Sequence, residues 1–258
     1  MGRKKERVDF NSFYSFYFPG RWESLKAALL EEPVRTAYEK GLLKPYYLDE
    51  ASVFTAMALD VKEGDKVLDL CAAPGGKTLI LAGQLGESGE LTSNDRSSAR
   101  RARLRKVIEE HLPEDAASRI KVTGHDASKW CLYEKDAYDK ILLDAPCSSE
   151  RHVLTSPPHL KKWGTARTKH LSIQAYAMLA SALDAVKPGG VIVYSTCALS
   201  PLENDGVVEK LGKKRPGRFR TVVPDIPFGE PTKYGWQILP DNTGGRGPMY
   251  IAKIIRTN

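Results

Sequence analysis

The sequence predicts an α/β fold, in which a doubly wound, mostly parallel seven-stranded sheet ends in a C-terminal antiparallel hairpin and follows a short N-terminal helical arm. Two observations carry this prediction. Short apolar runs that suit buried strands alternate with stretches of helical period. The first run of this series enters a turn of small residues, which is typical of the first strand-to-helix crossover in sheets that bind nucleotides.

Length and composition restrict the class of protein. A chain of 258 residues with 41% hydrophobic residues is long enough for one large packed domain. Its 39 Lys and Arg residues against 32 Asp and Glu residues give a net charge of +7, which suits a nucleic-acid partner without requiring one. No apolar run reaches membrane-spanning length, and the first residues lack the apolar core of a secretory signal, so we expect a cytoplasmic protein that does not enter a membrane. A mitochondrial location is the alternative if the sequence lacks a targeting segment.

Residues 1–45 are expected to form an aromatic and basic arm. A basic cluster at 3–7 precedes an aromatic patch at 10–18, and a short helix is expected over 22–30. Aromatic rings among basic side chains can stack on bases and neutralise phosphates, so the arm is expected to face RNA. The alternative is that the rings only pin the arm onto the larger domain, which we place at 46–258.

The larger domain is expected to open with a helix capped by Asp49, whose apolar face includes Val53 and Met57. Strands are expected at 66–70, 90–94, 120–123, 138–143 and 191–195, and a hairpin pairs 236–239 with 248–255. Helices are expected at about 78–85, 97–112 and 171–185, and Pro201 suits the start of another. The 213–220 stretch is expected to be an exposed basic linker.

Two further stretches can contact RNA. Residues 148–170 show no clean period, and a connection of that length inside a compact domain is more often functional than accidental. The helix at 97–112 carries a basic face, which is either solvated surface or an RNA contact. That face contains Arg100, Arg101, Arg103, Arg105 and Lys106.

The turn after the first strand is the candidate ligand loop. It reads Cys71, Ala72, Ala73, Pro74, Gly75, Gly76 and Lys77. Small residues let backbone N–H groups approach a ligand closely, and the start of the following helix favours a carboxylate or phosphate. The alternative is an ordinary strand-to-helix turn.

Polar and thiol side chains follow the predicted strands at their carboxyl ends. Such ends line one edge of a doubly wound sheet, so we expect these residues to gather there. They are Cys71, Asp95, Asp126, Asp144, Cys147 and Cys197. Asp95 stands where an acidic side chain can hydrogen-bond a ribose diol, and Asp126 suits an adenine amino group.

The four cysteines are too sparse for a disulfide framework or a zinc site, so we expect no metal. A thiol at a strand end beside a helix N-terminus can act as a nucleophile, although free cysteines are usually small buried hydrophobes. For Cys131, which has no partner motif, we expect the buried role.

Three motifs in order carry a family resemblance. CAAPGGKT at 71–78, DAPCSS at 144–149 and YSTCALS at 194–200 together resemble the Sun/Fmu family of RNA cytosine-5 methyltransferases. YYLDEAS at 46–52, PCSSERH at 146–152 and GPMYIAKI at 247–254 look most like its subgroup that includes organellar rRNA and tRNA enzymes. The resemblance covers roughly residues 44–255 and implies a Rossmann-like class I methyltransferase fold.

The resemblance implies a reaction that uses S-adenosylmethionine. Cys197 would attack C6 of a cytosine so that C5 can take the methyl group, Asp144 would bind the base edge, and Cys147 would assist loss of the C5 proton and release of the enzyme. The 71–77 loop would hold the methionine portion of the cofactor, Asp95 the ribose and Asp126 the adenine, with Arg100 and Asp144 also counted in the cofactor site. Lys77 could pair with the cofactor carboxylate or lie near the base.

The resemblance specifies the substrate and the partners less closely than the reaction. We expect a structured RNA, rRNA rather than tRNA, because the sequence has no obvious module for reading a tRNA fold. We see no appended RNA-binding domain, so either the 148–170 stretch and the basic helix bind RNA or an auxiliary RNA-binding protein assists an otherwise monomeric enzyme.

Three rival functions are compared with this one. A nicotinamide-dependent oxidoreductase lacks the G-x-G-x-x-G loop. A DNA cytosine methyltransferase would place its nucleophile in the Pro-Cys motif, whereas a Thr-Cys motif is also present here. A non-catalytic RNA-binding or ribosome-assembly protein would have lost Cys147 or Cys197.

Overall fold

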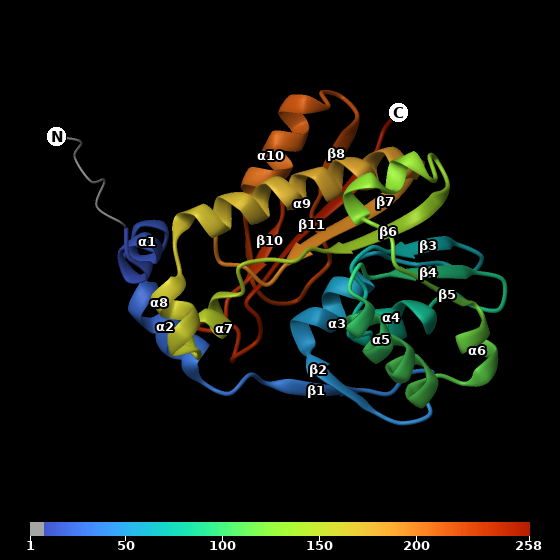
Figure 1. Cartoon of the computed structure of the whole chain (residues 1–258), viewed down its shortest axis with the longest axis horizontal. Helices are drawn as coiled ribbons and strands as arrows, with labels where there is room; N and C mark the ends of the chain where they lie inside the picture. The colour runs from blue at the N-terminus through green and yellow to red at the C-terminus, as the bar shows by residue number, and fades with distance from the viewer. Residues whose placement is uncertain (1–7) are drawn as a thin grey trace.

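The computed structural model describes residues 8–258, so the expected basic cluster at 3–7 lies outside the described part of the chain. A twisted sheet runs through the centre of the molecule (Figure 1). Its strands are β3 (Lys66–Asp69), β4 (Glu90–Asn94), β5 (Ile120–Thr123), β6 (Tyr138–Asp144), β7 (Val186–Thr196), β8 (Phe219–Val222), β9 (Glu230–Pro231), β10 (Trp236–Ile238) and β11 (Met249–Arg256).

The strand order confirms the doubly wound prediction. Along the sheet the order is β5-β4-β3-β6-β7-β11-β10-β9, and β8 pairs with β11. The first five of these strands are parallel, and β11 enters antiparallel between β7 and β10, which forms the expected C-terminal hairpin. The expected seven strands are all present. The described sheet contains two more, β8 and β9, which were not predicted.

Helices cover both faces of the sheet (Figure 1). On one face lie α3 (Glu50–Met57), α4 (Gly76–Ala82) and α5 (Ser98–His111), with α6 (Glu114–Ser118) at the β5 edge. On the other lie η1 (Ala127–Leu132), α9 (Thr165–Ala185) and α10 (Asp205–Lys214). Side chains alternate between the faces along each strand, so Val67 joins the core under α3–α5 while its neighbour Leu68 joins the core under α9.

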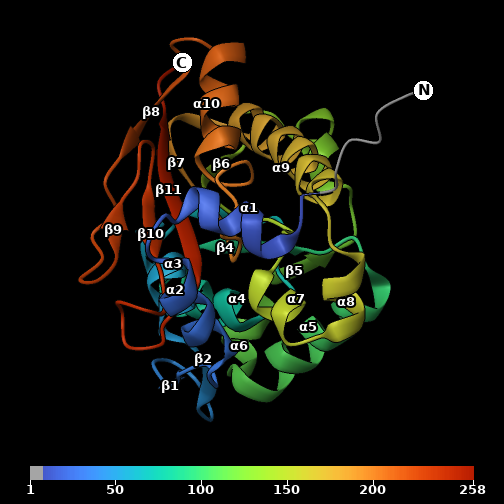
Figure 2. The same ribbon diagram turned by 90° about the vertical axis from the view of Figure 1, so that its left-hand side faces the viewer.

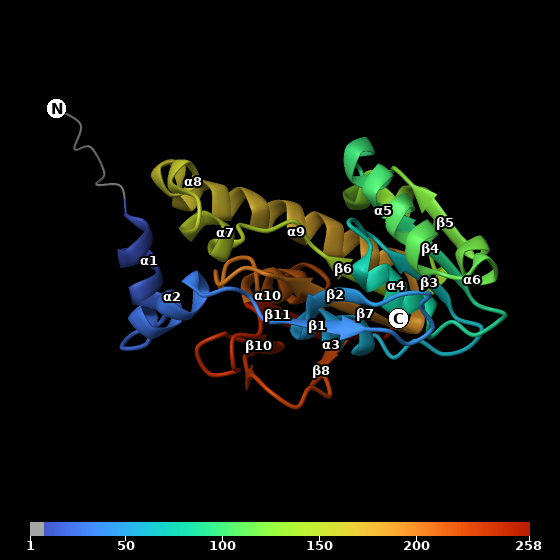
Figure 3. The same ribbon diagram turned by 90° about the horizontal axis from the view of Figure 1, so that it is seen from below.

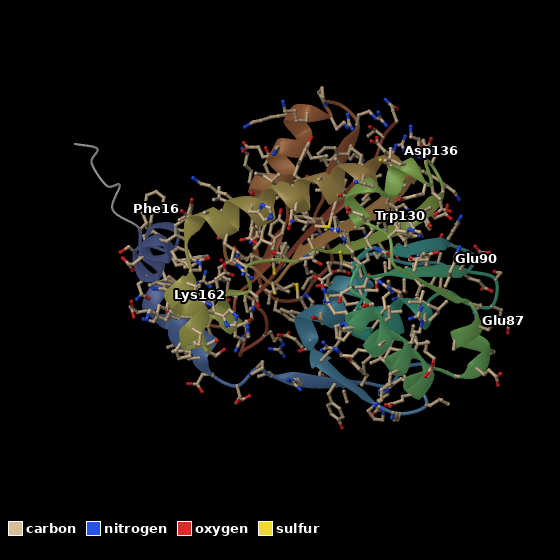
Figure 4. All side chains as sticks on the ribbon, in the orientation of Figure 1. Phe16, Glu87, Glu90, Trp130, Asp136 and Lys162 are labelled. Carbon is tan, nitrogen blue, oxygen red and sulfur yellow. The ribbon has the colours of Figure 1, made fainter. Side chains whose placement is uncertain are left out.

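The N-terminal arm packs onto the segment that follows β6. Its helices α1 (Phe10–Tyr17) and α2 (Trp22–Leu30) lie beside α7 (Glu150–Leu154) and α8 (Pro157–Lys162), at one end of the molecule (Figures 2 and 3). A third apolar cluster joins them, in which Trp163 meets Phe10 and Phe13 edge-on. The buried rings of the arm are those of Phe10, Phe13, Tyr14 and Trp22, whereas Phe16, at the outer edge of α1, is 78% exposed (Figure 4).

A two-stranded antiparallel ribbon, β1 (Arg35–Tyr38) with β2 (Tyr46–Asp49), links the arm to α3. The Asp49 carboxylate accepts a hydrogen bond from Ala51 N at 2.8 Å and caps α3 as predicted. Val53 is buried as expected, whereas Met57 is 50% exposed, although its neighbour Ala56 in the same turn is buried.

Several expectations about irregular segments are wrong. Residues 148–170 are not irregular but hold α7, α8 and the start of α9. Pro157 does not prevent α8, because it stands in the first turn of that helix, where its missing N–H costs nothing. Pro201 precedes α10 by four residues and accepts a hydrogen bond from Gly206 N instead of starting the helix. The 213–220 stretch is largely exposed as expected, but it is no linker, because it ends α10 and begins β8, where Phe219 packs under α9 and α10. Among residues 8–258, no helix has the length and apolar character needed to cross a membrane.

Candidate active site

The turn between β3 and α4 needs small residues for steric reasons. Gly75 precedes α4 with φ +123°, a conformation that side-chain-bearing residues rarely adopt, and a Cβ there would meet Val107 Cγ1 at 3.0 Å. A Cβ on Gly76 would lie 2.7 Å from Cε1 of Tyr46. The turn is therefore held between α5 on one side and β2 on the other, with its backbone at the sheet edge.

A cavity of about 130 Å³ opens over this turn. Of the predicted site residues, it is lined by Cys71, Ala72, Ala73, Pro74, Gly76, Lys77 and Asp144. Gly75 does not line it, because that residue faces α5. The other wall was not predicted from the sequence and consists of Tyr46, Tyr47, Leu48, Ser52 and Asp69. Only the position of β2 and α3 over the turn reveals that wall.

A second cavity of about 650 Å³ lies beside the first, and Cys71 lines both. It brings together Asp95, Arg100 and Asp126, as the sequence analysis expected. Its opposite wall comes from α9 and was not predicted. That wall consists of Ile173, Gln174, Ala177 and Met178. A cavity of this size is in the range of small-molecule sites.

Asp95 presents a buried carboxylate to the larger cavity. Its Oδ1 accepts a hydrogen bond from Ser97 N at 2.9 Å, while Oδ2 has no hydrogen-bond partner among the described residues and lies 3.3 Å from Nη1 of Arg100. Arg100 also donates to the Ala73 carbonyl and so ties Asp95 to the turn. A buried acceptor of this kind is suited to a ligand hydroxyl.

Asp126 caps η1 at the same cavity. Its Oδ1 accepts hydrogen bonds from Ser128 N at 3.0 Å and Ser128 Oγ at 2.7 Å. These bonds, with Ser128 Oγ the larger contributor, hold the pKa of Asp126 below its usual value. The residue therefore stays ionised and able to accept hydrogen bonds.

The two strand-end thiols meet. Sγ of Cys147 lies 3.0 Å from Sγ of Cys197, and both cysteines are free. A hydrogen bond from the Cys147 thiol lowers the pKa of Cys197, against the effect of burial, and Ser149 adds a second hydrogen bond. The same contact, burial and the carboxylates of Glu150 and Glu203 raise the pKa of Cys147. The Cys147–Cys197 contact thus moves the pKa values of the two thiols in opposite directions.

Cys71 and Cys131 differ from that pair. Burial, followed by the Asp69 carboxylate, raises the pKa of Cys71 well above its usual value, which keeps the thiol protonated. Cys131 is half-buried, and its backbone N–H donates to Ser181 Oγ at 2.9 Å.

Lys77 pairs with Asp144 in the lining of the smaller cavity. Lys77 Nζ lies 2.7 Å from Oδ2 of Asp144 and 3.3 Å from Oγ of Ser52. Burial alone would lower the pKa of Lys77, but the Asp144 carboxylate outweighs it and the pKa is raised. Ser195, which is the register partner of Asp144, donates to its Oδ1 at 2.9 Å and was missed by the sequence analysis.

The basic face of α5 is less uniform than expected. Arg100 and Arg101 are partly buried and are bonded to the carbonyls of Ala73 and Asp95, respectively. Arg103 and Arg105 are exposed. A second exposed basic surface lies on α8 and the start of α9, which we name the α8 basic surface. It consists of His159, Lys161, Lys162, Arg167 and Lys169.

The chain is also similar in sequence to known proteins. Residues 56–255 match the family described as 16S rRNA methyltransferase RsmB/F. The chain is 37% identical over 233 residues to the 5-cytosine rRNA methyltransferase NSUN4 of Bos taurus, with 84% of this chain and 60% of that protein covered. It is 40% identical over 247 residues to the mitochondrial tRNA (cytosine(34)-C(5))-methyltransferase of Danio rerio, with 89% and 66% covered.

A solved structure is also similar to this chain. The crystal structure of NSun6 from Pyrococcus horikoshii with SFG has a TM-score of 0.71 at 31% identity and covers 85% of this chain and 54% of that one. The chain spans about 60% of the length of the bovine relative.

Proposed function

Because the chain belongs to the RsmB/F methyltransferase family, we propose that it transfers a methyl group from S-adenosylmethionine to C5 of a cytosine in RNA. The observation that carries this proposal is the contact of Cys147 with Cys197, whose thiol interacts electrostatically with Asp144. Two thiols of unequal pKa at one sheet edge suit a reaction in which one forms a covalent bond to the base and the other assists its release.

The two cavities fit the proposed cofactor. Asp95, with a buried oxygen that accepts no hydrogen bond, suits the ribose hydroxyls, and Asp126 suits the adenine amino group. The backbone of the 71–77 turn suits the methionine portion, and Lys77 at the end of the turn interacts electrostatically with Cys197. When bound, S-adenosylmethionine supplies the methyl group.

Three residues of the chain carry out the other steps of the proposed reaction. Cys197, as thiolate, attacks C6 of the cytosine and makes C5 electron-rich. Asp144, held by Lys77 and Ser195, hydrogen-bonds the base edge and stabilises the adduct. Cys147 then assists loss of the C5 proton, after which the bond between Cys197 and C6 breaks. The contact of the two thiols, in which one shares a hydrogen with the other, agrees with one thiol attacking while the other assists release.

The rival functions have less support. No G-x-G-x-x-G loop stands at the crossover to serve a nicotinamide cofactor. Attack by the Pro-Cys thiol would use Cys147, whose pKa is raised. A protein that only binds RNA would gain nothing from two thiols held in contact.

For the substrate we propose rRNA, with tRNA as the second candidate. Several similar relatives are named as rRNA enzymes, but the zebrafish tRNA enzyme is 40% identical, so both classes have support. The name of that tRNA enzyme supports a mitochondrial location over the cytoplasmic one expected from the sequence. An auxiliary RNA-binding protein and a monomeric state stay as predictions.

Bisulfite sequencing of total RNA from cells with and without the gene tests the activity and the substrate together. A cytosine protected only when the gene is present supports the proposal and identifies the RNA. Identical protection at every cytosine in both samples contradicts it.

A further inference from the structure

Glu150 is a fully buried carboxylate that the proposed reaction does not use. Burying a charged group is costly unless hydrogen bonds compensate it. The partners that compensate this one come from three separate segments of the chain.

Both cysteine loops donate to the same carboxylate. Ser148, the residue after Cys147, donates its hydroxyl to Oε1 of Glu150. The backbone N–H of Leu199, two residues after Cys197, donates to Oε2 at 2.8 Å. Glu150 therefore joins the two loops directly behind their thiols.

A second carboxylate fixes the Cys147 loop further. Oε2 of Glu203 accepts a hydrogen bond from Ser148 N at 2.8 Å, and the hydroxyl of Tyr194, on β7, donates to the Glu203 carbonyl. Ser148 is therefore held at both its backbone and its side chain, and β7 holds the residue that binds it.

The third segment is the N-terminal arm. The hydroxyl of Tyr14, on α1, donates to Oε1 of Glu150. Its ring is fully buried and stacks on Trp22 with centroids 5.2 Å apart. The packing of the arm thus fixes the direction of a hydrogen bond behind the thiols.

We propose that Glu150 is a positioning residue that holds the Cys147 and Cys197 loops at their mutual separation, with Tyr14 of the N-terminal arm as its third anchor. Its consequence for catalysis rests on the proposed function. The geometric part concerns only the two thiols, so it can be tested without RNA.

The first test measures the effective concentration of the two thiols for each other, from the equilibrium between their disulfide and a glutathione redox buffer, with the bond mapped by peptide mass spectrometry. Positioned thiols have a high effective concentration. We expect Glu150→Gln and Ser148→Ala to lower it about tenfold, the size expected when a hydrogen bond to a buried charged group is lost. Tyr14→Phe, which keeps the buried ring, should lower it less.

Ser200→Ala is the matched control. Ser200 is fully buried near the same loops, and its Oγ has no hydrogen-bond partner among residues 8–258, so this substitution removes a buried hydroxyl without removing a bond. It should leave the effective concentration unchanged. Unchanged values in folded Ser148→Ala and Tyr14→Phe, whether or not Glu150→Gln folds, would overturn the proposal.

The second test uses the methylation assay on RNA. In Glu150→Gln and Ser148→Ala, the loosened position of Cys147 relative to Cys197 should lower kcat about tenfold at unchanged KM for RNA. The fraction of enzyme trapped as covalent adduct should rise, because the release step is slowed more than the attack. A uniform loss of both steps would indicate a merely structural role and contradict the proposal. A wild-type enzyme that does not methylate would refute the proposed function but leave the glutathione result standing.

Discussion

Lys77 Nζ lies 2.7 Å from Oδ2 of Asp144, so the helix after the ligand turn is tied to the strand that carries the Asp-Ala-Pro-Cys motif. This pairing favours the base side over the cofactor side of the two roles expected for Lys77. Lys77→Met removes the cation and keeps most of the side chain. We expect the methylation rate to fall at least roughly tenfold, since hydrogen bonds to charged groups are worth about 1.5–3 kcal/mol.

The affinity for S-adenosylmethionine, measured by calorimetry on the same variant, distinguishes the roles. A Kd within about twofold of wild type agrees with a lysine that holds Asp144, as a twofold change is under 1 kcal/mol. A loss of affinity as large as the loss of rate would place Lys77 on the cofactor carboxylate instead.

Replacing Cys197 by Ala should abolish methyl transfer, because the nucleophile is lost, while cofactor binding persists. Transfer of a radiolabelled methyl group to RNA and calorimetry with the cofactor provide the two measurements. Cys131→Ala, at a half-buried thiol away from both cavities, is the matched control and should keep its activity. Substantial turnover by the Cys197 variant would contradict its role.

Glu203 should make stability depend on pH. Burial, then the nearby Glu150 carboxylate, raises the pKa of Glu203 from 4.5 to about 7 in the folded state. The folded protein therefore binds a proton that the unfolded chain has released, so the free energy of unfolding from this group falls as pH rises from about 4.5 to 7 and levels off above.

Glu203→Gln should flatten that dependence and raise the free energy of unfolding at pH 8 by about 1–3 kcal/mol. Urea unfolding across pH 4.5–8 measures it. Glu87→Gln, at an exposed carboxylate on the periphery, should leave the wild-type slope in place (Figure 4). An identical slope in the Glu203 variant would show that this carboxyl does not hold the proton.

The α8 basic surface should contribute to RNA affinity through phosphate contacts. Replacing Lys161 and Lys162 by Gln should weaken binding and reduce the slope of log K against log salt by about 1.4, if each contacts one phosphate of a single strand. The control is Lys213→Gln with Lys214→Gln, a basic pair on α10 that is also exposed. Equal effects of the two pairs on fluorescence-anisotropy titrations would argue for non-specific charge.

Strand ends were the most predictable part of the site. Asp95, Asp126, Asp144, Cys147 and Cys197 each follow an apolar run, and parallel strands bring such ends to one edge, so their convergence follows from topology. The helices α7 and α8 were missed because five or six residues are too few to show a period.

Contacts between residues that lie far apart in the chain could not be predicted from the sequence. Ser195 faces Asp144 through the pairing register of β6 and β7, which no local pattern specifies. Tyr14 looked like one ring of an aromatic patch, and its bond to Glu150 depends on how the arm packs, 136 residues away in sequence.

The covalent division of labour between the two thiols is most directly tested with Cys147→Ser, incubated with substrate RNA and S-adenosylmethionine and analysed on a denaturing gel. We predict a protein–RNA adduct that resists denaturation and that disappears when Cys197→Ala is added to the same chain. No adduct under conditions in which the wild-type enzyme turns over, or an adduct that survives loss of Cys197, would contradict the account.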